Sequence, residues 1–183
     1  MTKHEFETFL ETKASEAKTP NTIDWGARKQ EWLGSLQKFY DEVEVWLSDY
    51  LKSDKIGMEP GEVTLEEENL GVYRAQSRVL TIGADRVVLR PIGTLLFGVR
   101  GRVDMEGPNG TVKFILTGKR SNGIRISASA APASGRAAAP APESEPDASE
   151  EWVWKIATAP PKVRFIELTS EAFFDALMEV VNG

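Results

Sequence analysis

The chain of 183 residues contains no cysteine and one histidine. Without cysteine, the protein has no disulfides, thiolate nucleophiles, iron–sulfur clusters or cysteine-ligated zinc sites. The one histidine is His4, so a centre with several histidine ligands is excluded, and a Ser-His-Asp triad would have to recruit His4 as its base. P-loop, G-x-S-x-G and G-x-G-x-x-G motifs are also missing from the sequence. We therefore expect no enzymatic activity, no cofactor and no metal site.

Long hydrophobic runs are also missing. No apolar run approaches the roughly 18 to 20 residues that a transmembrane helix needs. The first residues, Met1 to Glu5, contain no apolar segment of the kind found in secretory signals. Hydrophobic residues make up 41% of the chain and charged residues 27%, which is typical of a globular protein with a buried core. We expect a soluble, cytoplasmic protein.

The net charge of −6 is unevenly distributed along the chain. Residues 1–69 have a net charge of −8, residues 70–126 of +7 and residues 127–183 of −5. A basic segment of this kind can indicate an anionic or nucleic-acid partner. We favour the alternative, in which the acidic segments lie against the basic one and neutralise it, because a net-negative protein repels nucleic acid at long range.

Two helices are expected before residue 56. The first, Lys3 to Glu16, has a capping-box pattern at its start and a narrow apolar stripe of Phe6, Phe9 and Leu10. The second, Asp24 to Lys52, is the clearest pattern in the sequence, because apolar residues recur there at alternating steps of four and three. Its face could form a coiled-coil contact or a cofactor groove, but we expect it to cover a sheet. The recurring residues are Trp32, Leu36, Phe39, Val43, Trp46 and Tyr50.

A run of turn-forming residues at 53–61 precedes a change to a period of two, which is typical of strands. Pro91 and Gly93 are expected to end one strand, and Gly98 and Gly101 to bend another. Asn109-Gly110 predicts a hairpin turn. Strands are expected around Val63 and Leu65 and at Val72–Ile82, Arg86–Leu89, Leu95–Met105, Thr111–Thr117, Ile124–Ile126, Trp152–Ile156 and Val163–Leu168.

These elements predict an α+β fold with two N-terminal helices, a five- to seven-stranded antiparallel sheet or partly open barrel, and a C-terminal helix that begins at Thr169 or Ser170. Between Ser127 and Glu151 the sequence is rich in Ala, Pro, Ser and Glu. It offers too little apolar surface to fold, so we expect a flexible insertion in a loop of the sheet. We expect residues 1–56 to pack as a helical segment on the sheet of residues 57–183, within a single folding unit.

Four arginines of the basic segment are the candidate ligand-binding residues: Arg74, Arg78, Arg100 and Arg102. Arg74 and Arg78 are expected on one face of a strand, and Arg100 and Arg102 on one face of another, so two basic rows could meet across strands. Guanidinium groups bind phosphate and carboxylate through paired hydrogen bonds. The alternative that we favour is a solvated face whose arginines are paired in part with nearby acids.

Two further patterns have both a functional and a structural interpretation. Glu66 and Glu68 fall on one face of a strand and could share a cation, although a solvated edge explains them more simply. Trp152 and Trp154 could stack on bases or sugars, but their alternation with Ile156 predicts core positions.

The sequence thus favours a non-enzymatic protein-binding or adaptor domain that presents its sheet and long helix to another protein, and self-association is also considered. The alternative is a domain that binds an anionic ligand, such as a phospholipid headgroup or nucleic acid, through the basic strands. An enzyme that uses carboxylates and arginines is a weaker alternative. Anion binding should weaken steeply with salt, whereas apolar docking should not.

Overall fold

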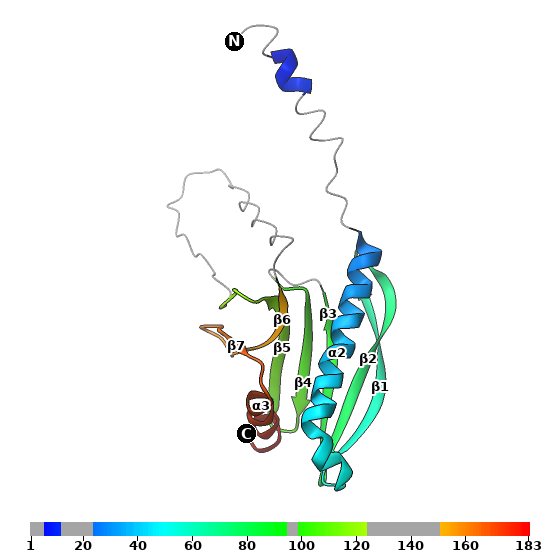
Figure 1. The fold of residues 1–183 in the computed structure, drawn as a ribbon, viewed down its shortest axis with the longest axis vertical. Helices are drawn as coiled ribbons and strands as arrows, with labels where there is room; N and C mark the ends of the chain where they lie inside the picture. Colours follow the sequence, from blue (N-terminus) through cyan, green and yellow to red (C-terminus); the bar gives the residue numbers. More distant parts are fainter. Residues whose placement is uncertain (1–5, 12–23, 95–98, 124–150) are drawn as a thin grey trace.

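The computed structural model describes residues 6–11, 24–94, 99–123 and 151–183. Within these residues, two helices cover one face of an open antiparallel sheet of seven strands, and a short helix spans residues 6–11 (Figure 1). The predicted α+β class, antiparallel sheet and C-terminal helix are confirmed. Of the predicted first helix, Lys3–Glu16, residues 6–11 are helical and the others lie outside the described residues.

The long helix α2 spans Trp25–Lys52, close to the predicted bounds. The side chain of Asp24 caps it by accepting a hydrogen bond of 3.0 Å from the backbone N–H of Ala27. Its apolar face packs on the sheet as predicted, except that Trp46 is half-buried and Tyr50 is exposed. The buried residues of the helix are Trp32, Leu36, Phe39, Tyr40, Val43 and Leu47.

The strands lie in space in the order of the sequence, and each is antiparallel to the next. Among the described strands, β1 and β7 form the two edges and do not pair, so the sheet is open and the barrel alternative is wrong. The C-terminal helix α3 spans Ser170–Asn182 and is capped by Thr169. The strands are β1 (Gly57–Glu67), β2 (Gly71–Ile82), β3 (Asp85–Gly93), β4 (Gly101–Gly107), β5 (Gly110–Gly118), β6 (Trp152–Ala157) and β7 (Phe165–Glu167).

Two predicted breaks turn out to be strand. Residues 57–61, predicted as part of a turn, begin β1. Pro60 is tolerated there because β1 is an edge strand, where a missing backbone N–H need not disrupt the sheet. Strand β3 continues through Pro91 to Gly93, and its register with β4 shifts between these two residues.

Other predicted bounds lie wholly or partly outside the described residues. Strand β4 begins at Gly101, not at Leu95, and residues 95–98 are not described. The predicted strand Ile124–Ile126 and the insertion up to residue 150 also lie outside the described residues.

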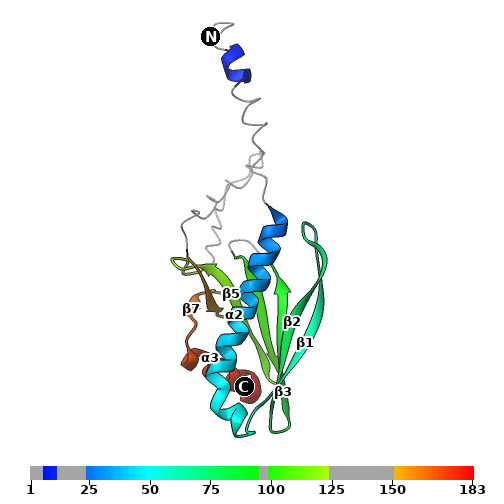
Figure 2. The ribbon, with the colours of Figure 1, turned by 45° about the vertical axis from the view of Figure 1, so that its right-hand side comes forward.

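A row of aromatic rings joins both helices to the same face of the sheet. The ring of Phe39 on α2 lies 5.3 Å from that of Phe114 on β5, which lies 6.0 Å from that of Phe173 on α3. Phe39 also lies 4.8 Å from the ring of Trp154 on β6. Figure 2 shows α2 running across the sheet with α3 beside its C-terminal end. The first half of α2 therefore borders β6, and its second half borders α3.

Strands β2 and β3 pair only along residues Arg78–Ile82 of β2. Before Arg78 the two strands are not paired, and the side chain of Tyr40 on α2 reaches both of them there. The Tyr40 hydroxyl donates a hydrogen bond of 2.9 Å to the carbonyl oxygen of Gln76 and lies 3.3 Å from that of Leu89. The guanidinium carbon of Arg78 lies 4.6 Å from the ring centroid. Burial raises the pKa of Tyr40 well above its usual value, and the nearby Arg78 charge opposes this only in part.

Candidate functional site

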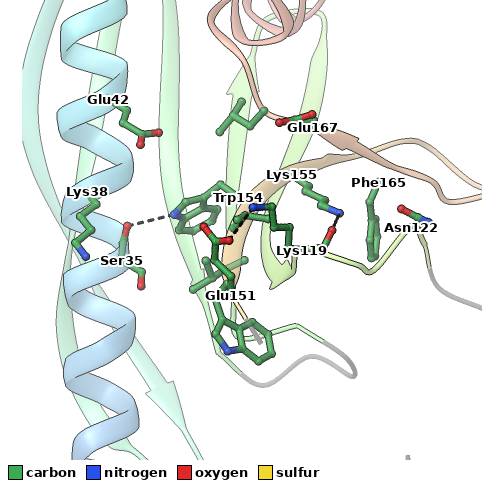
Figure 3. A pocket seen from close by; sticks show the side chains of 14 residues that line it. Ser35, Lys38, Glu42, Lys119, Asn122, Glu151, Trp154, Lys155, Phe165 and Glu167 are labelled. Carbon is green, nitrogen blue, oxygen red and sulfur yellow. Dashed lines mark hydrogen bonds and ion pairs between the residues drawn. The ribbon is translucent and has the colours of Figure 1, made fainter. Parts of the chain in front are cut away.

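A cleft of about 720 Å³ opens between α2, strand β6 and the segment that leads from β7 into α3 (Figure 3). This volume lies within the range typical of ligand sites. Helix α2 lines it with Ser35, Lys38 and Glu42. The remaining lining residues come from the sheet and its loops: Leu116, Lys119, Asn122, Glu151, Trp152, Val153, Trp154, Lys155, Phe165, Glu167 and Leu168.

The cleft runs along a part of β6 whose outer edge no described strand covers. Strand β7 pairs with residues 155–157 and ends at Glu167, so residues 152–154 pair with β5 alone among the described strands. On the β5 side, the N–H of Lys119 donates to the carbonyl of Glu151 (2.9 Å). On the β7 side, the N–H of Thr158 donates to the carbonyl of Arg164 (2.9 Å).

These two bonds fix the direction of the backbone groups in between. In an antiparallel pair, alternate residues direct their N–H and C=O groups toward the partner strand. Since Glu151 bonds toward β5 and Thr158 toward β7, the backbone groups of Trp152 and Trp154 point toward the outer edge. The cleft is therefore bordered by backbone donors and acceptors that no described strand pairs.

The α2 wall of the cleft is fixed to β6 by Trp154. Its indole N–H donates a hydrogen bond of 3.2 Å to the backbone carbonyl of Ser35, and its ring packs on Trp32 and Phe39. Trp154 thus packs against the core, as the alternation predicts, but it also lines the cleft. The ring of Trp152 lies 4.0 Å from the guanidinium carbon of Arg100.

Two lysines stabilise the wall of the cleft opposite α2, which is formed by Glu151 and the loop that follows β5. Lys119 Nζ lies 2.8 Å from Glu151 Oε2, and this hydrogen-bonded ion pair raises the pKa of the exposed Lys119 ammonium. Lys155 is only 6% exposed, and its ammonium donates to the backbone carbonyls of Lys119 (2.8 Å) and Ser121 (2.6 Å). Lys155 therefore anchors the loop that follows β5 and keeps the cleft walls in place.

A buried carboxylate at the far side of the sheet was missed by the sequence reasoning. Glu67, 9% exposed, accepts hydrogen bonds from the hydroxyl of Tyr73 and from the backbone N–H (3.0 Å) and hydroxyl (2.7 Å) of Thr94. Burial, and then the contact with Glu67, raise the pKa of Tyr73. Glu66 and Glu68, the candidate cation ligands on either side of Glu67 in the sequence, are exposed. No group of acidic or histidine residues suited to a metal ion occurs among the described residues.

The structure places each of the four candidate arginines beside a group of its own chain. Arg74 lies 3.2 Å from Glu62 and Arg100 3.3 Å from Glu31. Arg102 makes two contacts of 2.6 Å with Asp104. The three acids offset the charges of Arg74, Arg100 and Arg102, and the guanidinium group of Arg78 lies over the Tyr40 ring. Strand β3 separates Arg74 and Arg78 on β2 from Arg102 on β4, so the two predicted rows do not lie on neighbouring strands.

Comparisons with known proteins leave the interpretation to the geometry. The chain matches no protein-family model, no curated protein and no solved structure. Among the described residues, no helix is both long enough and apolar enough to cross a membrane.

Proposed function

We propose that the chain is a non-enzymatic protein-binding domain that accepts an extended segment of a partner protein as an additional strand at β6. The observation that carries this proposal is the outer edge of β6, where the backbone groups of Trp152 and Trp154 face an open cleft beside α2. Addition of a strand to an exposed sheet edge is a recurring way for proteins to bind peptides, because backbone hydrogen bonds supply affinity.

The cleft also supplies groups that would select a sequence. Side chains of an added strand alternate between the two faces of the sheet. On the face covered by α2 they would meet Lys38 and Glu42, and on the other face they would meet the Lys119–Glu151 pair. We expect bound segments to carry an acidic residue near Lys38 and a basic residue near Glu42.

The anion-binding alternative has less support. Its candidate arginines already lie beside Glu62, Glu31, Asp104 and the Tyr40 ring, so an incoming phosphate would have to compete with those partners. For the enzymatic alternative, the described residues offer a buried carboxylate at Glu67, but all three hydrogen bonds described for it tie it to Tyr73 and Thr94.

The test begins with a phage-displayed library of random twelve-residue peptides selected on the full chain. An enriched peptide is then synthesised with a methyl group on one backbone nitrogen at a time. Methylation removes the N–H donor, so strand addition predicts that binding is lost at two positions separated by one residue, those that pair with Trp152 and Trp154, and is kept at the position between them. Loss without this alternation, or enrichment of no peptide, would overturn the proposal.

Protein variants locate the site. Lys38→Glu and Glu42→Lys reverse exposed charges on the α2 wall and are expected to weaken binding of the enriched peptide and to change which charged residues it prefers. Lys52→Glu, an exposed change in the last turn of α2 outside the cleft lining, is the matched control. If replacement of residues 124–150 by a Gly/Ser linker is required before any peptide binds, the cleft belongs to the chain's own segment and not to a partner.

A further inference from the structure

A second, separate groove lies between the end of α2 and α3. It has a volume of about 260 Å³ and is lined almost entirely by apolar side chains, among them Tyr50, Ile56, Ile82, Phe174, Met178 and Val181. The volume is below that of typical small-molecule sites, so the groove suits the side chains of a docked segment better than a whole ligand.

The groove is open at the surface. Tyr50 on α2 is 41% exposed and Met178 on α3 is 56% exposed, while the rings of Tyr50 and Phe174 meet edge to face at 6.1 Å across it. Aromatic and methionine side chains are typical of surfaces that bind other proteins. Helices α2 and α3 form its long walls, and Ile56, directly before β1, and Ile82, at the end of β2, close it on the sheet side.

The α3 side of the groove is acidic. On α3, Glu171 lies three residues before Phe174 and seven before Met178, so all three fall on one side of the helix. Asp175 lies three residues before Met178. Helix α3 contains Glu171, Asp175 and Glu179 and no basic residue, whereas the charges at the end of α2 are mixed, with Asp49, Lys52 and Lys55 near Tyr50 and Ile56 in the sequence.

We infer that this groove docks an amphipathic helix of a partner protein, with apolar residues on the face that enters the groove and lysine or arginine residues beside it. Helices bind in such grooves through apolar residues at i, i+3 or i+4, and i+7. The acidic residues of α3 favour basic residues along that side of the docked helix and disfavour acidic ones by like-charge repulsion. The groove uses Leu47 and Tyr50, and the cleft beside β6 uses Ser35, Lys38 and Glu42, so one chain can hold both partners and act as an adaptor.

The experiment selects from a phage-displayed library of a helical scaffold with one randomised face, using the full chain as bait. Enriched faces are expected to carry apolar residues at the helical spacing with lysine or arginine beside them. Binding of a synthesised winner is measured by fluorescence anisotropy at low and high salt. We expect Met178→Asp to weaken it at least tenfold, because a charge then lies where the apolar face docks.

Two further variants keep the result interpretable. Val45→Asp also places a carboxylate on an exposed apolar residue, one that is 70% exposed and does not line the groove, and it should leave binding unchanged. Glu171→Lys combined with Asp175→Lys should reduce the affinity for basic helices and flatten its salt dependence. Equal enrichment of acidic and basic faces, or equal effects of Met178→Asp and Val45→Asp, would overturn the inference.

The experiment also distinguishes two other occupants of the groove, a second copy of the chain and the helix at residues 6–11. Self-association that Met178→Asp abolishes would assign the groove to a second copy of the chain, and stronger binding after Phe6→Asp would assign it to the helix at residues 6–11; either result overturns the inference. The groove and the cleft are tested separately, because Met178→Asp should not affect a strand peptide and Lys38→Glu should not affect a helix.

Discussion

The hydroxyl of Tyr40, on the long helix, donates a hydrogen bond of 2.9 Å to the carbonyl oxygen of Gln76, on a strand. A helix side chain thereby closes the opening between β2 and β3 that the strands themselves do not close. This contact and the hydrogen bond of Trp154 with Ser35 hold α2 over the sheet at two separate places.

Replacing Tyr40 by phenylalanine removes the donor and leaves buried carbonyl oxygens without it. We expect Tyr40→Phe to lower the free energy of unfolding by about 1–3 kcal/mol, measured by urea denaturation. Tyr50→Phe, at an exposed position, should change it by less than about 0.5 kcal/mol. Because burial raises the pKa of Tyr40 in the folded state, the unfolded chain releases this proton first as the pH rises above about 10.

Wild-type stability should therefore fall with pH above about 10 more steeply than that of Tyr40→Phe. Parallel pH profiles of the two proteins would show that the hydroxyl ionises as readily in the folded as in the unfolded state, against the burial described.

Gly101 is required by a close approach to Trp32. A Cβ atom at residue 101 would lie 2.2 Å from Trp32 Cζ3, and Trp32 is buried. Gly101→Ala should therefore destabilise the protein by about 1–3 kcal/mol through overpacking. Gly34→Ala is the matched control, since nothing lies within 4 Å of a Cβ there and an exposed helical position should gain about 0.5–1 kcal/mol. Thermal unfolding of both variants checks the sign, and a stabilising Gly101→Ala would contradict the packing of α2 on β4.

The buried ammonium of Lys155 is expected to be structural. Lys155→Met keeps the aliphatic stem but leaves the carbonyl oxygens of Lys119 and Ser121 without their donor, which should cost about 1–3 kcal/mol. Lys119→Met removes an exposed pair with Glu151 and should have little effect on urea unfolding. If the two variants are equally stable, the loop after β5 does not depend on Lys155.

The arginine contacts predict poor binding of polyanions. A fluorescent single-stranded oligonucleotide should bind with an affinity weaker than micromolar at about 0.15 M salt, where exposed charges are screened beyond roughly 8 Å. Replacing Arg74 and Arg102 together by glutamine should change the binding little. Sub-micromolar binding with a log–log salt slope that falls by about 0.7 for each arginine removed would instead favour the anion-binding alternative.

The sequence predicted best those elements whose pattern is local. The steps of four and three along α2, the Asn109-Gly110 turn and the existence of strand β6 follow from residues close together in the chain. The predicted bounds of β1 and β3 are wrong because they rest on Pro60 and Pro91 as strand breakers. Proline can be accommodated at a sheet edge or at a register shift, and neither feature is visible in the sequence.

The candidate sites were harder to predict because they depend on distant residues. Glu67 is buried because Thr94, far along the chain, supplies donors, and no pattern near Glu67 marks this. Three of the basic-segment cations meet acids of the acidic segments, in the pairs Arg74–Glu62, Arg100–Glu31 and Lys119–Glu151, as the favoured interpretation of the charge distribution expects. The open edge of β6 arises because β7 stops at Glu167 and the chain turns into α3, which only the tertiary structure reveals.

Hydrogen exchange of two backbone amides tests the central claim most directly. In the protein alone, the N–H groups of Trp152 and Trp154 face the cleft, so they should exchange faster than that of Val153, whose N–H points toward β5. On saturation with the enriched strand peptide, NMR should show slower exchange at Trp152 and Trp154 and little change at Val153. Tight peptide binding that leaves both tryptophan amides exchanging as before would contradict strand addition at β6.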